Sequence, residues 1–152
     1  MAVLSAATVG ATNRLSASVA PAQVIDIALK SVGMKGEAGT LTRQALLRNL
    51  DIAIKLGCLD TEDLEQMRRG KASTVRHDPY AGDQLSVDHI IPRAVCPELD
   101  NVIANLELMP LRMNESKDDK IGARQIGLAC KLHSAGLLSA EGKQKIDSHP
   151  QR

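Results

Sequence analysis

The chain has 152 residues, of which 43% are hydrophobic and 24% are charged. This length is typical of one domain and suffices to bury roughly two-thirds of the unfolded surface in a core. No apolar run approaches the ~18 residues that a membrane span requires, so we expect no membrane partner. The 19 basic and 18 acidic residues almost cancel. Net charge therefore does not indicate nucleic-acid binding, and such a partner must be argued from local features.

Aromatic and cysteine content narrows the class of protein further. Tyr80 is the only aromatic residue, which removes the stacking platforms that bind single-stranded nucleic acid without sequence preference. The three cysteines lie far apart and form no C-x-x-C pair. We therefore expect reduced thiols and a cytoplasmic protein rather than a zinc knuckle, a redox centre or a disulfide framework. Residues 18–20 could pass for a signal-peptidase site, but no basic residue precedes the mild apolar stretch at residues 3–11, so secretion is the less favoured alternative.

The N-terminal half is predicted to be helical. Residues 1–20 are expected to form a flexible segment. A first helix begins at Pro21, a residue suited to the first helical turn. Apolar residues then recur at three-to-four spacing until Gly33 and Gly36 end the pattern.

Two further helices are expected before residue 71. A second helix, capped by Thr40 or Thr42, presents a broad apolar stripe made of Leu46, Leu47, Leu50, Ile54 and Leu56. A short third helix, capped by Asp60 or Thr61, completes the helical region of residues 21–70.

The second half of the chain has the pattern of a β-hairpin. Turn-forming residues precede a β-branched apolar run at residues 85–91, which predicts a strand. After a loop at residues 92–100, residues 102–109 form a second extended segment, and the two strands could pair antiparallel. The sequence then returns to a helical pattern from Asn114 or Ser116.

A last short helix, capped by Ser139, precedes a polar C-terminal tail. No internal repeat, low-complexity tract or linker divides the chain. We therefore predict an α+β protein in which a helical N-terminal half packs on a hairpin-plus-helix module at residues 71–135. A C-terminal helix and tail at residues 136–152 complete what is expected to be one compact domain.

Four polar residues of the second half have the spacing of a known motif. Asp88 and His89 lie together in the predicted first strand, Asn105 lies in the second, and Asn114 begins the helix. Each alone has a simpler structural explanation, such as a hydrogen-bonded pair at a strand end or a helix N-cap. Their joint spacing favours a shared site.

In this spacing the chain resembles the HNH endonuclease family. Residues 87–93, V-D-H-I-I-P-R, are similar to the family's D-H-I-x-P segment. Residues 105–114 keep the spacing of its N-L-x-x-L-x-x-x-x-N stretch, and Lys117 matches a lysine that commonly follows the last asparagine. The resemblance covers residues 71–124, about a third of the chain. It implies a ββα-metal fold that holds one divalent metal ion and hydrolyses phosphodiester bonds.

The resemblance also implies a role for each residue of the motif. His89 would activate water as general base, Asp88 and Asn114 would bind Mg²⁺ or Mn²⁺, and Asn105 would organise the loop and the histidine. An imidazole with its ordinary pKa of ~6.5 can be neutral near physiological pH, and carboxylate and amide oxygens are ligands that these metals prefer. Neighbouring residues of a strand point to opposite faces, so Asp88 and His89 can share a site only where the strand bends or ends. Pro92 favours such an ending.

Two features depart from the family pattern. Many relatives bind a structural zinc through cysteine pairs, whereas Pro110 and Met113 occupy the matching places here. We therefore expect no structural zinc. Residues 88–124 contain seven acidic and five basic residues, so the motif itself is not a surface that attracts DNA.

Basic residues that could hold phosphates occur in two places. Arg93 and Lys117 flank the proposed site. A denser group just before the first strand could contact phosphates on either side of the cleavage point, or could be a solvated helix end: Arg68, Arg69, Lys71 and Arg76. His77 could approach the metal or be an exposed loop histidine, and His133 and His149 are expected at the surface.

The sequence thus predicts a metal-dependent endonuclease that hydrolyses double-stranded DNA, with a homodimer or an accessory protein left open as a further partner. One alternative is a non-catalytic nucleic-acid-binding or scaffold protein on the same fold. Another, a secreted or toxin-type nuclease, differs in destination and not in chemistry.

Overall fold

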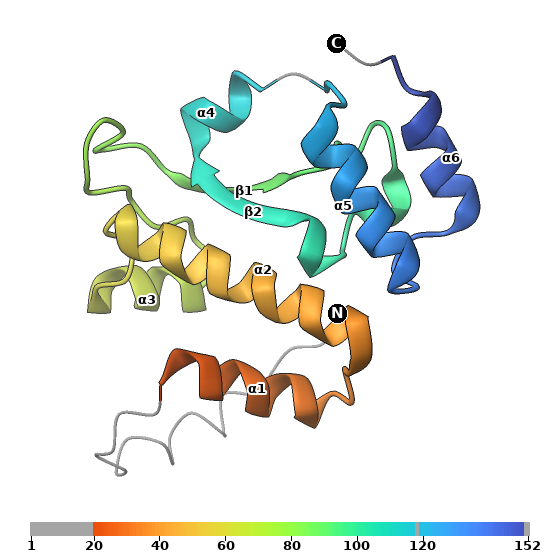
Figure 1. The fold of residues 1–152 in the computed structure, drawn as a ribbon. Coiled ribbons are helices and arrows are strands. Elements are labelled where there is room, and N and C mark those ends of the chain that lie inside the picture. Colours follow the sequence, from red (N-terminus) through yellow and green to blue (C-terminus); the bar gives the residue numbers. More distant parts are fainter. Residues whose placement is uncertain (1–19, 118, 151–152) are drawn as a thin grey trace.

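The computed structural model describes residues 20–117 and 119–150. Within this part, six helices surround one two-stranded antiparallel sheet. The first helix, α1 (Pro21–Ser31), packs against the long α2 (Gly36–Lys55), and the short α3 (Thr61–Arg68) follows (Figure 1). No helix of the described residues is both long and apolar enough to cross a bilayer. The predicted flexible N-terminal segment lies outside the described residues, apart from Ala20.

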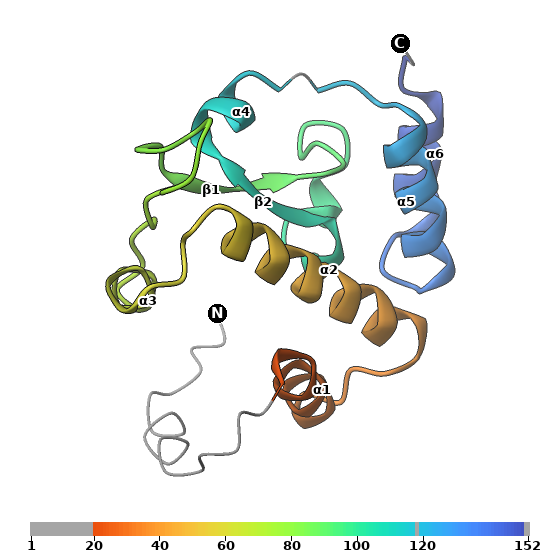
Figure 2. The same cartoon turned by 60° about the vertical axis from the view of Figure 1, so that its left-hand side comes forward.

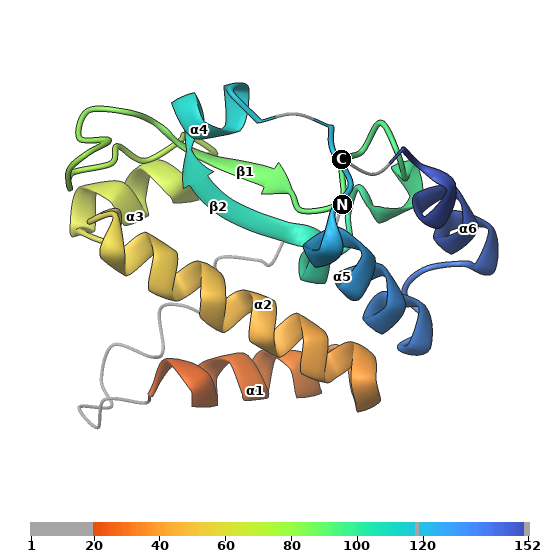
Figure 3. The ribbon, with the colours of Figure 1, turned by 45° about the horizontal axis from the view of Figure 1, so that its top comes forward.

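The hairpin consists of β1 (Leu85–His89) and β2 (Leu106–Pro110), which pair antiparallel as predicted. Helices α2 and α3 lie on one side of it, and the short α4 (Leu111–Glu115) lies on the other (Figures 1 and 3). Helices α5 (Ala123–Ser134) and α6 (Ala140–Ser148) lie beside the end at which β1 stops, as Figure 2 also shows. The coarse prediction of a mixed α+β protein is therefore confirmed.

Helix α2 begins earlier than predicted. Thr40 and Thr42 lie inside the helix, where each hydroxyl donates to the carbonyl four residues earlier, at 3.1 and 2.8 Å. Lys35, with an extended backbone, is the N-cap instead. The predicted cap of α3 is confirmed, because the Asp60 carboxylate accepts the Asp63 N–H at 2.8 Å. Ser139 caps α6 in the same way.

Helix α2 packs against β2 and binds its backbone through Asn49. Ala45 and Ala53 are buried, whereas Ile54 of the predicted apolar stripe is 55% exposed. The Asn49 amide donates to the Leu106 carbonyl and accepts the Leu108 N–H, each at 3.0 Å. It thereby occupies the edge of β2 that β1 does not pair, an edge that would otherwise leave backbone groups unpaired.

The second strand is shorter than predicted. A 3-10 turn at Ile103–Asn105 precedes β2, so Asn105 lies before the strand and not within it. The Asn105 N–H donates to the Val102 carbonyl at 2.8 Å and closes this turn. Residues 102–105, expected to be extended, are therefore folded back toward the loop.

The long helix expected from residue 114 or 116 is in fact two helices, α4 and α5. Asn114 lies inside α4 and is not an N-cap. The start of α4 is held by Asp83, whose carboxylate accepts the Arg112 N–H at 3.0 Å. The sequence S-K-D-D-K at residues 116–120 offers little apolar surface to bury, which explains why no single helix runs through it.

Two clusters of buried side chains lie at opposite ends of the hairpin. The larger joins the loop between the strands to α5 and α6 and contains Ile91, Cys96, Leu99, Ala104, Ile121, Ala129, Leu132, Leu138 and Ile146. The smaller contains Cys58, Val75 and Leu85. The long loop between the strands is thus anchored in the core at the end where β1 stops.

Candidate functional site

An open cleft at the end of β1 brings the predicted site residues together. Asp88, His89 and Asn114 line this cleft of about 260 Å³, together with Arg93 and Lys117. Its remaining lining residues are Pro92, Ala94 and Asp119. One cleft therefore collects side chains from β1, from the loop after it and from α4 and the segment that follows.

Asp88 and His89 reach the same cleft because β1 ends at His89, two residues earlier than predicted. The next two N–H groups leave the strand ladder: Ile90 donates to the Asn105 carbonyl and Ile91 to the Asn105 Oδ1, both at 2.8 Å. The expectation that the strand must end at this pair is confirmed.

Asn105 does not line the cleft, because it is completely buried. Its Nδ2 donates to the Ile91 carbonyl at 3.1 Å, so its side chain pairs with both main-chain groups of Ile91. This is the geometry of a residue that organises the loop. It acts on the two residues after His89 and makes no hydrogen bond with the His89 ring.

Lys117 forms an ion pair with Asp88 at the floor of the cleft. Its ammonium donates to Asp88 Oδ2 and, at 2.9 Å, to the His89 carbonyl. The Asp88 side chain is only 12% exposed, so the pair is partly shielded from water and from salt. A metal ion at this carboxylate would have to share or displace the Lys117 ammonium.

Asn114 reaches the cleft from α4. Its Nδ2 donates to Ser86 Oγ at 3.2 Å and approaches the Val87 carbonyl at 3.4 Å. With the amide nitrogen engaged by β1, Oδ1 is the atom that remains for a ligand in the cleft.

Asp83 holds the first turn of α4 in place and so positions Asn114. The backbone N–H of Arg112 is the largest influence on this carboxyl and lowers its pKa. Burial opposes that effect, while the N–H of Gln84 and the Arg112 guanidinium add to it. Because these partners favour the charged form, Asp83 stays ionised on acidification beyond the ordinary range of an aspartate.

His89 has a carboxylate neighbour that the sequence analysis missed. Its Nε2 lies 3.1 Å from the Asp100 carbonyl and 3.1 Å from Asp100 Oδ1. The Arg93 Nε lies 3.5 Å from the same Oδ1. The motif gave no signal for Asp100, which lies between its two halves at the end of a loop of unremarkable composition.

A second acidic residue, Glu107, lies directly opposite Asp88 in the hairpin register. Residues paired in this way have side chains on the same face of the sheet, where two like charges destabilise it. Each carboxylate has its own cations: Lys117 contacts Asp88, while Arg48 and Arg124 contact Glu107 at 3.2 and 2.6 Å. This balance keeps the Asp88 end of the cleft from carrying an uncompensated negative charge.

The dense basic group predicted to hold phosphates does not line the cleft. Arg68 and Arg69 both pair with Glu65 of α3, and Arg76 pairs with Asp60 and Asp63. Lys71 follows α3, which lies across the hairpin from α4 (Figure 3). Of the basic residues expected to contact DNA, only Arg93 and Lys117 are at the candidate site.

The other histidines lie away from this cleft. His77 is exposed, and its Nδ1 contacts the Lys55 carbonyl at 2.7 Å, as expected for a loop histidine and not for a metal ligand here. His133 is exposed on α5, and His149 is partly buried at the end of α6.

The donor set of the cleft fits one magnesium-like ion better than zinc. The described residues contain no group of three or more His, Cys, Asp and Glu side chains able to hold a metal. Asp88 and Asn114 supply two oxygen atoms, which suits Mg²⁺ or Mn²⁺ because these ions keep several waters. The cysteines lie elsewhere: Cys58 and Cys96 are buried and Cys130 is exposed.

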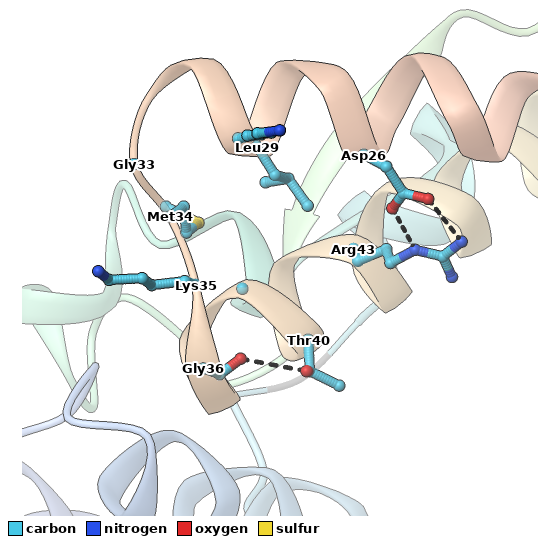
Figure 4. A pocket seen from close by; sticks show the side chains of 10 residues that line it. Asp26, Leu29, Gly33, Met34, Lys35, Gly36, Thr40 and Arg43 are labelled. Carbon is cyan, nitrogen blue, oxygen red and sulfur yellow. Dashed lines mark hydrogen bonds and ion pairs between the residues drawn. The ribbon is translucent and has the colours of Figure 1, made fainter.

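A larger hollow of about 550 Å³ lies between α1 and α2 (Figure 4). Asp26 and Arg43 close one side of it through hydrogen bonds of 2.6 and 3.3 Å, and Leu29 and Met34 contribute apolar surface. No histidine lines it, and the one carboxylate among its lining residues, Asp26, is in this ion pair. Size alone therefore does not identify a site, and the residues of the motif line the smaller cleft.

Comparison with known proteins gives no relative. No family model, no curated protein and no solved structure matches this chain. The motif and the geometry of the cleft are therefore the features that indicate a function.

Proposed function

We propose that this protein is a divalent-metal-dependent endonuclease of the HNH type, with a ββα-metal module that hydrolyses phosphodiester bonds of double-stranded DNA. One observation carries the proposal: Asp88 and His89, at the end of β1, and Asn114, in α4, line one cleft. Asn105, the fourth residue of the motif, is buried and hydrogen-bonded to Ile91, which supports the loop-organising role that the resemblance implies. A chance match of spacing would not require these four residues to have such related positions.

The roles follow from the atoms available. Asp88 and Asn114 Oδ1 would hold the metal, which when bound would stabilise the charge that develops on the phosphate and on the leaving oxygen. His89 would take a proton from the attacking water. Arg93 is 69% exposed and can reach a phosphate, and Lys117, once released from Asp88, can do the same.

Duplex DNA is the favoured substrate because the cleft is open and polar. It contains no aromatic side chain on which an unpaired base could stack. Few cations line it, so we expect modest affinity and weak sequence preference, with a homodimer or an accessory partner able to supply further contacts. The cysteine pattern supports a cytoplasmic location.

A cleavage assay with matched variants tests this proposal. Supercoiled plasmid is incubated with the full chain in Mg²⁺, in Mn²⁺ and in EDTA, beside Asp88→Asn, Asn114→Ala and Asp147→Asn. We expect metal-dependent nicking that falls by at least about a hundredfold in the first two variants. The control changes an exposed carboxylate of α6, paired with Lys143, and should cleave normally. Cleavage that persists in EDTA, or in Asp88→Asn, contradicts the proposal.

A non-catalytic DNA-binding protein is the second candidate, and the contact between Lys117 and Asp88 favours it. An ammonium at this carboxylate can replace the metal and leave a neutral, structural ion pair. The two candidates differ in metal binding. Titration with Mn²⁺ that detects no binding, in protein that still binds duplex DNA, supports the second candidate and not the first.

A further inference from the structure

We infer that Asp100 is a positioning residue for His89, fixing the imidazole so that Nδ1 is the nitrogen that accepts the proton from water. This inference rests on the proposed function in naming the reaction. The arrangement it describes, a carboxylate and a main-chain oxygen that together hold Nε2, can be measured without it.

The His89 Nε2 faces two oxygen atoms of one residue. This nitrogen lies 3.1 Å from two oxygens of one residue, the Asp100 carbonyl and the Asp100 Oδ1. Both oxygens are acceptors, so Nε2 must carry the hydrogen for either contact to be favourable. A neutral ring with a hydrogen on Nε2 has its free lone pair on Nδ1.

The His89 ring is partly exposed to the cleft. The His89 side chain is 26% exposed and lines the cleft. Since Nε2 faces Asp100, Nδ1 is the ring nitrogen left to meet a water molecule there. The other tautomer would place two acceptor oxygens against a bare lone pair, which is unfavourable.

The loop backbone holds Asp100 in place. Its backbone N–H donates to the Pro97 carbonyl at 3.1 Å, at the end of a 3-10 turn over Pro97–Leu99. Leu99 is completely buried in the larger core cluster. Asp100 is thus placed by packed structure, and it can hold the ring in one orientation at little further cost in entropy.

The charge around this contact is shared by three groups. Arg93 Nε lies 3.5 Å from the same Asp100 Oδ1, so the carboxylate lies between the imidazole and a guanidinium. Arg93 keeps Asp100 from being an isolated anion beside the cleft. The Asp100 carboxylate can then stabilise the positive charge that the ring acquires when it takes a proton.

In the reaction, the water oxygen forms a bond to phosphorus and the bond from phosphorus to the leaving alcohol oxygen breaks. His89 Nδ1 takes the proton of the water, and the leaving oxygen takes a proton from solvent. Asp100 receives no proton and remains ionised, while the hydrogen on Nε2 stays between the ring and Asp100. No oxidant, reductant or further co-reactant is needed.

The test combines cleavage kinetics with nitrogen NMR of the histidine rings. The proteins are the full chain, Asp100→Ala, Asp100→Asn and the control Asp147→Ala on α6. In Asp100→Ala we expect kcat to fall on the order of ten- to a hundredfold, with KM changed less than about twofold. Asp100→Asn keeps an acceptor oxygen without the charge and should recover part of this loss. A merely structural role would not give this order, and wild-type kcat in Asp100→Ala overturns the inference.

The NMR measurement is independent of cleavage. In the wild-type protein the signal of His89, assigned with His89→Gln, should show a hydrogen on Nε2 that exchanges slowly with water, and a bare Nδ1. In Asp100→Ala this exchange should become at least about tenfold faster, because only the main-chain acceptor remains. A wild-type ring with its hydrogen on Nδ1 contradicts the inference, as does unchanged exchange in Asp100→Ala. If no protein cleaves DNA in any metal, the proposed function fails while the NMR result still decides the role of Asp100.

Discussion

The side-chain amide of Asn105 is hydrogen-bonded to both main-chain groups of Ile91, at 2.8 and 3.1 Å. Both residues are completely buried. This pairing ends β1, turns the chain into the loop and leaves Asp88 and His89 at the edge of the cleft. One buried asparagine therefore determines where the strand stops and where the candidate site begins.

Removing this amide should destabilise the protein strongly. In Asn105→Ala, the N–H and the carbonyl of Ile91 lose their partners in the core, and each unsatisfied buried group costs about 1–3 kcal/mol. We expect the free energy of unfolding in urea to fall by about 2–4 kcal/mol. Asn101→Ala, at an exposed position of the same loop, should change it by less than about 0.5 kcal/mol. Equal stabilities of the two variants would contradict this account of the loop.

Lys117 and a divalent metal should compete for Asp88. Replacing Lys117 by Met removes the ammonium that contacts Asp88 Oδ2 and keeps most of the apolar stem. We expect Mn²⁺ to bind about fivefold more tightly, since an ion pair of this kind contributes on the order of 1 kcal/mol. Isothermal titration of the folded variant gives the constant. Lys131→Met, which removes the same charge from an exposed position of α5, should leave Mn²⁺ affinity unchanged. Weaker binding in Lys117→Met would argue against a metal at Asp88.

The carboxylate that holds α4 should make stability depend on pH. The pKa of Asp83 is lowered in the folded protein, chiefly by the Arg112 N–H, so its stabilising effect is complete above the unfolded value of ~3.9. That effect is lost as the pH falls through the lower, folded pKa. Thermal unfolding should therefore show a Tm difference between wild type and Asp83→Asn that is largest near neutral pH and shrinks in acid below this range. A difference that stays constant, or grows in acid, would contradict the assignment.

Two glycines allow the effect of backbone strain on stability to be distinguished from the effect of a steric clash. Gly57 and Gly70 both have a positive φ, of 70° and 73°, a conformation that costs any other residue about 1–2 kcal/mol. A Cβ at Gly57 would lie 2.9 Å from His77 Nε2, whereas a Cβ at Gly70 would have no neighbouring atom within 4 Å. Gly57→Ala should therefore lower the free energy of unfolding more than Gly70→Ala does. Equal losses of stability would show that the loop around His77 moves to accommodate the added methyl group without lowering the free energy of unfolding.

Much of the fold follows from local sequence features. The proline at the start of α1, the Asp60 cap of α3 and the Ser139 cap of α6 are short-range signals, and all three are confirmed. Two of the differences from the sequence analysis involve contacts between residues far apart in the chain. Asp83 precedes β1 and holds the start of α4, which follows β2, and Asn105 lies before β2 and bonds to Ile91. Neither contact is visible from propensity or periodicity.

The candidate site likewise has some residues that the sequence pattern could indicate and others that depend on distant contacts. The spacing of the motif grouped Asp88, His89 and Asn114, and all three line one cleft. The spacing could not indicate Asp100, because its contact with His89 depends on how the intervening loop packs. Nor could local charge density show that Arg68, Arg69 and Arg76 are paired with acidic neighbours of α3 and its cap.

The most direct test of the central claim is single-turnover cleavage of duplex DNA by His89→Ala in the presence of Mn²⁺. His133→Ala, which removes an exposed histidine from α5, is the matched control. Because a general base contributes about 10²- to 10⁴-fold, we expect His89→Ala to lose at least a hundredfold in rate, while the control cleaves as wild type does. Binding of Mn²⁺ and DNA should persist in both variants. Cleavage by His89→Ala at the wild-type rate would contradict the account.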